Sequence, residues 1–137
     1  MLESLGAEAT ASVLLLPQPW RALYTSFKLD AEVRNGGFHQ FFWNSEGNLN
    51  DAIAEDLASF GATQFADIFK RAADCATEFR VVETKRRSEN TWEEFTDGYK
   101  TIPWDSRDRA YYEASPTLFQ LVARYVREHP TDFDRNA

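Results

Sequence analysis

The sequence has one cysteine, Cys75, and two histidines, His39 and His129. A single cysteine excludes an internal disulfide and fits a reducing compartment. The histidines lie far apart, and neither belongs to a cluster with metal-ligand spacing. The chain also lacks a phosphate-binding glycine loop and a nucleophile elbow. We therefore expect no metal, no cofactor and no catalytic residue, and we interpret Cys75 as a packed thiol and His39 as a structural, hydrogen-bonded residue.

Long apolar runs are also missing. The apolar segment at residues 13–16 is short and ends at Pro17, and the N-terminus carries Glu3 and Glu8 where a secretory signal would be basic. We therefore expect a cytoplasmic protein with no membrane-spanning helix. A composition of 43% hydrophobic and 15% aromatic residues can build the core of one domain of this size. We place this domain at residues 20–137, after an N-terminal extension at 1–19.

No convincing strand alternation is present, and apolar residues recur instead at three- and four-residue steps. We therefore predict an all-α domain of five to seven helices. Gly61 is expected to separate two helices of a hairpin, and Thr91 with Glu94 matches a capping box at a helix start. Asp105 or Ser106 is expected to cap a later helix. The helical segments expected from this periodicity are residues 1–16, 20–31 with 38–42 on the same helical face beyond the glycines, 51–60, 65–76, 92–99, 105–114 and 118–126.

Two further segments are predicted from their composition. Residues 80–90 are charged and lack helical periodicity, so we predict a loop there. Residues 35–44 read Asn-Gly-Gly-Phe-His-Gln-Phe-Phe-Trp-Asn, and the two glycines are expected to end or kink the preceding helix. Buried amides need partners, so the amide side chains are expected to cap or cross-brace the nearby backbone. We assign a structural role to Asn35, Gly36, Gly37, Phe38, Gln40, Phe41 and Asn44.

Acidic residues are unevenly distributed. The formal net charge is −7, and residues 44–69 contain no lysine or arginine. One interpretation is an acidic face that imitates a phosphate backbone and docks on a basic protein. The other is that acids simply favour the first turns of helices, which suits Asp51 and Glu93, while the basic cluster at residues 85–87 interrupts any uniform surface. The candidate partner-binding residues are Glu46, Asp51, Glu55, Asp56, Asp67, Glu89, Glu93 and Asp97.

The motif at residues 35–44 resembles the signature of the bacterial DNA-mimic protein family. The similarity extends over roughly residues 20–129, through the polar turn at residues 45–47, the hairpin around Gly61 and the closing helix at 118–125. The resemblance implies an all-helical fold, an acidic surface and often a homodimer. It also implies a function in which the protein occupies the DNA-binding surface of a regulatory protein in place of DNA.

We therefore predict a non-catalytic acidic interaction protein whose partner is a basic protein surface, such as that of a DNA-binding regulator. Direct binding to nucleic acid is not expected, because the phosphates would repel this chain. The alternative is an immunity-type protein that inhibits a toxin or another enzyme and uses shape and aromatic residues as much as charge. A small enzyme is a third hypothesis, which depends only on His39, Cys75 and carboxylates meeting in space.

Overall fold

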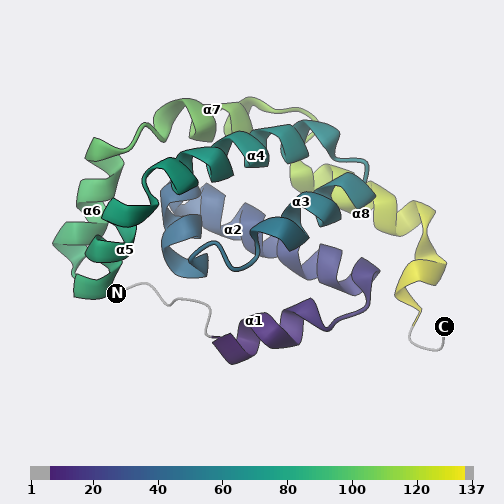
Figure 1. Ribbon diagram of the computed structural model, residues 1–137. Helices are drawn as coiled ribbons and strands as arrows, with labels where there is room; N and C mark the ends of the chain where they lie inside the picture. Colours follow the sequence, from purple (N-terminus) through teal and green to yellow (C-terminus); the bar gives the residue numbers. More distant parts are fainter. Residues whose placement is uncertain (1–6, 135–137) are drawn as a thin grey trace.

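The computed structural model describes residues 7–134, and in this part of the chain all regular secondary structure is helical, without a β-strand (Figure 1). The all-α prediction is confirmed, with one α-helix more than the expected maximum of seven. Residues 1–6 of the expected first helix lie outside the described range. The elements are α1 (Ala7–Leu14), α2 (Gln18–Ser45), α3 (Asn50–Ser59), α4 (Thr63–Glu78), α5 (Arg80–Glu89), α6 (Trp92–Thr101), α7 (Asp105–Glu113), α8 (Leu118–Glu128) and a 3₁₀ helix at Pro130–Phe133.

The long helix α2 is the centre of the fold. It begins directly after Pro17, and Pro19 lies in its first turn, where a fixed φ suits the helix and the missing amide hydrogen costs no helical hydrogen bond. Helices α1, α3, α6, α7 and α8 all contact α2, and Figure 1 shows them arranged around it. Leu29, Val33, Phe38 and Phe41 on α2 have no exposed surface. Both halves of the long helix therefore contribute to the same core.

The predicted loop at residues 80–90 is wrong, because residues 80–89 form α5. Only Phe79 separates α5 from α4. Val81 and Val82 are exposed on this helix, whereas Glu83 is buried. An apolar pattern cannot reveal a helix that packs through a carboxylate, so the periodicity of the sequence missed it.

Helix ends follow the sequence signals in part. Gly61 adopts φ +70° between α3 and α4, as expected for the hairpin. The Thr91 hydroxyl accepts a hydrogen bond from the Glu94 amide at the start of α6, which confirms the N-cap. A complete capping box occurs instead at Thr117 and Gln120, where α8 begins. Asp105 lies in the first turn of α7, and no side chain caps that helix.

Candidate partner-binding surface

The motif at residues 35–44 forms a break inside α2. Gly36 has φ −149° and ψ 20°, and Gly37 has φ +74° and ψ −176°, so two residues leave the helical conformation within a continuous helical segment. The angles of Gly37 lie in a region that is essentially restricted to glycine. A Cβ on Gly37 would lie 2.5 Å from a carboxylate oxygen of Asp108, and one on Gly36 would collide with the Gln40 side chain. The break therefore kinks the helix, and both glycines are required by it.

A break in a helix leaves backbone groups without helical partners. Here the later helices supply those partners. Asp108 on α7 accepts a hydrogen bond from the Phe38 amide at 2.9 Å. The Tyr99 hydroxyl on α6 donates to the Gly36 carbonyl, and the Tyr112 hydroxyl on α7 donates to the Val33 carbonyl, each at 2.6 Å. The kink is therefore fixed by side chains from two other helices, which the motif alone could not reveal.

The amides of the motif brace one another and a buried acid rather than the backbone. Glu32, which is only 8% exposed, accepts hydrogen bonds from Gln40 at 2.7 Å and from Asn44 at 3.0 Å. Asn35 donates to the Gln40 side chain at 3.0 Å, and Lys28 pairs with Glu32 at 3.0 Å. Glu32 was missed because a lone glutamate on an amphipathic helix gives no signal of burial.

His39 and Cys75, the two residues considered for catalysis, are both buried. The His39 Nε2 lies 2.6 Å from the Phe95 carbonyl oxygen, so Nε2 carries the proton in the neutral ring. Burial lowers the pKa of His39 to about 4. His39 is therefore neutral near pH 7, and the 3.7 Å approach of its Nδ1 to Glu83 is not a charged ion pair. Burial likewise raises the pKa of the Cys75 thiol and keeps it protonated.

The exposed acids of the hairpin gather in a groove between α3 and α4. Asp51 from α3 and Asp67 from α4 line this groove, together with Asp74 and Lys70. All four of these side chains are exposed. Asp74 was missed because it lies beyond Lys70, outside the base-free segment at residues 44–69. The structure thus joins two predicted residues and one unpredicted residue in a single acidic groove.

Asp56 does not belong to an exposed acidic surface. Its side chain is completely buried, and it accepts hydrogen bonds from Arg21 at 2.7 Å and from Thr25 at 2.7 Å. The expectation that Asp56 faces a partner is therefore wrong. Arg21 and Thr25 lie on α2. The packing of α3 on α2 therefore buries Asp56, a residue of the acid-only segment, in an internal ion pair. The neighbouring Glu55 remains exposed and lies 3.4 Å from the same arginine.

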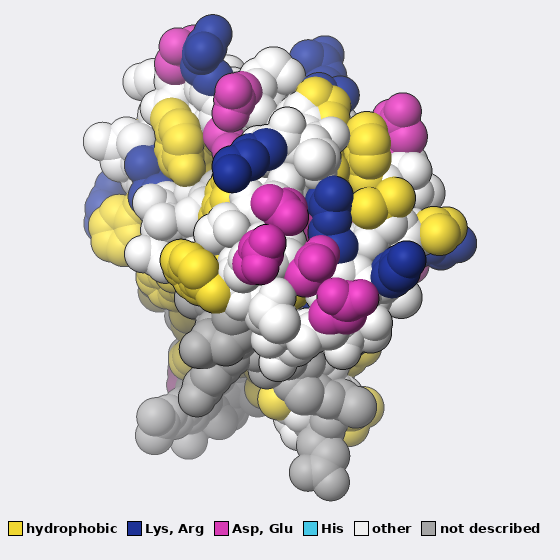
Figure 2. Space-filling model, turned by 90° about the vertical axis from the view of Figure 1, so that its left-hand side faces the viewer, with side chains coloured by type: hydrophobic (Ala, Val, Ile, Leu, Met, Phe, Trp, Pro, Cys, Tyr) yellow, Lys and Arg dark blue, Asp and Glu magenta, His cyan; other side chains and the backbone are white. Residues whose placement is uncertain are grey.

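The remaining acids lie toward α5 and α6. Glu89 and Glu93 are exposed near the junction of these helices, and Asp97 is partly exposed. Figure 2, which views this end of the molecule, shows acidic side chains gathered together with lysine and arginine side chains among them. Glu46 pairs with Arg87 at 3.6 Å. This second acidic area is therefore interspersed with bases, unlike residues 44–69.

No cluster of three or more metal-ligating side chains occurs within residues 7–134, and no helix in that range is long and apolar enough to cross a membrane. The fold and surface define a small all-helical protein with a kinked central helix and exposed acidic areas. The chain belongs to the DMP19-like protein family, whose family model matches residues 14–129. No curated protein and no solved structure gave a significant match.

Proposed function

We propose that this protein is a non-catalytic interaction protein that occupies the DNA-binding surface of a basic partner, such as a transcriptional regulator. The observation that carries the proposal is the α3–α4 groove, where three exposed aspartates accompany a single lysine. Membership of the DMP19-like family, a family of DNA mimics, supports the same function. The net charge of −7 favours attraction to basic protein surfaces.

The geometry of the groove suits this role. Asp67 and Asp74 are seven residues apart on α4, which separates them by about 10 Å along the helix axis. Asp51 approaches from α3, so the carboxylates come from both walls of the groove. Lysine and arginine side chains that bind DNA phosphates can pair with such carboxylates instead. Binding through these exposed charges must weaken with salt, because the screening length falls to about 8 Å at physiological ionic strength.

The experiment compares two charge-matched triple variants. The first changes Asp51, Asp67 and Asp74 to asparagine, and the second changes Glu89 and Glu93 to glutamine and Asp97 to asparagine. Each variant removes three negative charges, so the two proteins have the same net charge. The wild-type protein is immobilised, and proteins from cells of the source organism that are released by duplex DNA are identified and purified. DNA binding by the released protein is then measured with each variant as competitor.

We expect wild type to displace DNA from that partner, with a competition that weakens as salt increases. The groove variant should compete with DNA at least about tenfold more weakly than wild type, and the second variant should compete nearly as well as wild type. If both variants compete equally well, or if only the second fails, the groove is not the DNA-mimicking surface. Competition that ignores salt would contradict the electrostatic basis of the proposal.

The alternative function is inhibition of a toxin or another enzyme through shape and apolar contacts. The exposed Trp92 favours it, at 63% exposure, because tryptophan side chains anchor many protein interfaces. Trp92→Ala should then abolish binding to the inhibited enzyme, while the groove variant should leave it unchanged. The opposite result would favour the DNA-mimic proposal.

The absence of catalysis is part of the proposal, and the burial of His39 and Cys75 supports it. A homodimer is also proposed. Phe27 on α2 and Phe119 on α8 are 45% and 55% exposed, and their ring centroids lie 5.9 Å apart. Two adjacent phenylalanines on the surface form an apolar patch that a second copy of the chain can cover.

A further inference from the structure

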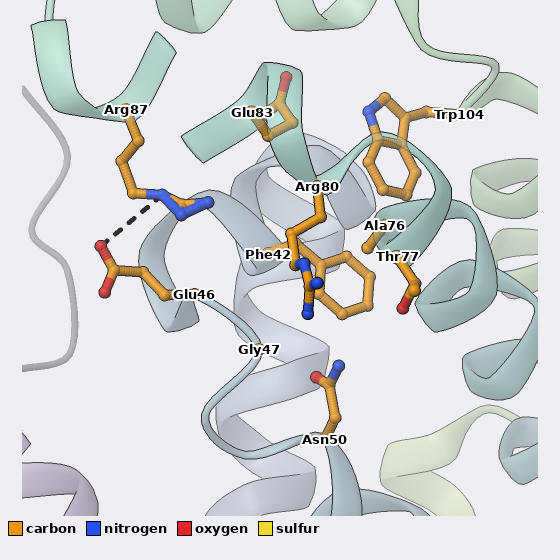
Figure 3. A pocket seen from close by; sticks show the side chains of 10 residues that line it. All are labelled: Phe42, Glu46, Gly47, Asn50, Ala76, Thr77, Arg80, Glu83, Arg87 and Trp104. Atoms are coloured by element: carbon orange, nitrogen blue, oxygen red, sulfur yellow. Dashed lines mark ion pairs between the residues drawn. The ribbon is translucent and has the colours of Figure 1, made fainter. Parts of the chain in front are cut away.

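A pocket lies between the end of α2, the end of α4 and α5, next to the acidic groove (Figure 3). It encloses about 470 Å³ of empty space, counting its open mouth. Phe42 and Ala76 contribute apolar surface, and the Trp104 ring stacks on Phe42 with centroids 5.8 Å apart. The pocket therefore offers an apolar wall of the size that a single aromatic ring or a short alkyl chain would cover.

The charged groups around this pocket favour a negative ligand. Arg80 and Arg87 both line it, and Arg80 makes no ion pair within residues 7–134. The two carboxylates that line it already have cations: Glu46 pairs with Arg87 and Glu83 pairs with Arg86. In a chain with net charge −7, this pocket is a local site where one arginine has no acidic partner.

Two of the three unsatisfied polar atoms in the pocket wall are donors, which indicates the same preference. The Trp104 indole nitrogen is a buried donor without a hydrogen-bond acceptor. The Arg87 Nε also makes no hydrogen bond, although it lies 3.6 Å from the Glu46 carboxylate, and Asn50 Oδ1 is a buried acceptor without a donor. Trp104 is only 2% exposed, and Figure 3 shows its indole nitrogen on the ring edge turned toward Glu83. Unpaired buried donors are costly, and an anionic acceptor would satisfy the two donors best, whereas Asn50 Oδ1 needs a donor instead.

We propose that this pocket binds a small organic carboxylate with an aromatic or alkyl tail. The carboxylate contacts the guanidinium groups of Arg80 and Arg87, and the tail packs against Phe42 beside Trp104. This site adjoins the acidic groove, with which it shares Asn50 and Thr77, but it uses different charged residues and does not depend on the DNA-mimic proposal. A fragment of about ten non-hydrogen atoms in an open pocket is expected to bind with a dissociation constant on the order of millimolar.

The test uses phenylacetate as the probe, with 2-phenylethanol and 2-phenylethylamine as neutral and cationic analogues. Binding is followed by two-dimensional NMR of the ¹⁵N-labelled protein, through the indole N–H signals of its tryptophans. The signal of Trp104 is assigned by its loss in the Trp104→Phe variant. We expect phenylacetate to shift the Trp104 signal with saturation, and the two analogues to bind at least about fivefold more weakly.

The matched variants are Arg80→Gln and Arg127→Gln. Both remove one exposed positive charge, but Arg127 lies at the end of α8 and does not line the pocket. Arg80→Gln should weaken phenylacetate binding at least about fivefold, and Arg127→Gln should leave it unchanged. The proposal is overturned if the shift does not saturate, if the neutral or cationic analogue binds as well as phenylacetate, or if the two variants behave alike.

Discussion

Substitution of Gly37 by alanine isolates the role of the kink in α2, because Gly61 provides a matched control. Both glycines have positive φ, at +74° and +70°. A Cβ on Gly61 meets nothing within 4 Å, whereas a Cβ on Gly37 meets the carboxylate of Asp108. Both alanine variants gain the same small benefit from a less flexible unfolded chain, so that contribution cancels in the comparison.

The expected magnitudes follow from these surroundings. Gly61→Ala should lower the free energy of unfolding by about 1–2 kcal/mol, the cost of a left-handed conformation for an L-residue. Gly37→Ala incurs a conformational cost of about 1–3 kcal/mol, because its angles are nearly exclusive to glycine. It also displaces Asp108 from the Phe38 amide, and an unpaired buried donor costs about 1–3 kcal/mol more. The total, about 2–6 kcal/mol, is a large fraction of the stability of an ordinary domain.

The assay is urea unfolding followed by far-ultraviolet circular dichroism, analysed as a two-state transition. A double-mutant cycle adds Asp108→Ala, which removes both the collision and the hydrogen bond. In that background, Gly37→Ala should cost less than it does in wild type. The reasoning is refuted if Gly37→Ala and Gly61→Ala lower stability equally within about 0.5 kcal/mol, or if the cycle shows no coupling.

Three further predictions concern other parts of the molecule. Asp56→Ala should lower the free energy of unfolding by about 3–5 kcal/mol, because it leaves the Arg21 guanidinium without its buried carboxylate partner. Substitution of the exposed Glu55 by alanine should lower it by less than about 1 kcal/mol in the same urea assay. The folded-state pKa of His39, about 4, is below its ordinary value of 6.5, so its stabilising contribution is present above about pH 6.5 and is lost as the pH falls toward 4. Between about pH 7.5 and about pH 5, the free energy of unfolding of wild type should fall by about 2 kcal/mol through His39. A His39→Phe variant should be equally stable at both pH values, which would assign the loss to His39. Phe27→Ser with Phe119→Ser should convert a dimer into a monomer in analytical ultracentrifugation, and an unchanged sedimentation coefficient would contradict that interface.

The sequence predicts the helices that bury an apolar stripe. Leu118 and Val122 identify α8, and Gly61 identifies the hairpin of α3 and α4, because both signals are local. The same pattern does not predict helix α5, because Glu83 rather than an aliphatic residue is buried on it. For the same reason, the pattern cannot distinguish exposed Asp51 from buried Asp56, since the difference is made by arginine and threonine side chains on another helix.

In the candidate site, too, the sequence predicts the local features but not the partners that come from other helices. The motif glycines and amides indicate a structural junction, but the groups that complete the junction are Tyr99, Asp108 and Tyr112, far along the chain. The acid-only segment at residues 44–69 includes Asp51 and omits Asp74, which lies beyond Lys70. Spacing along one helix predicts neighbours on that helix, whereas a surface assembled from two helices depends on how they pack.

The kink in α2 also has a consequence for the order of folding. The groups that bind its free backbone atoms lie 63, 70 and 79 residues further along the chain. A ribosome that has released only the first ninety residues has therefore supplied the bent helix but none of those three partners. The N-terminal half must wait for the C-terminal helices before its central bend is secured, which makes completion of the fold dependent on long-range contacts. The two halves of the chain are thus joined at the kink by three hydrogen bonds between side chains of α6 and α7 and the backbone of α2.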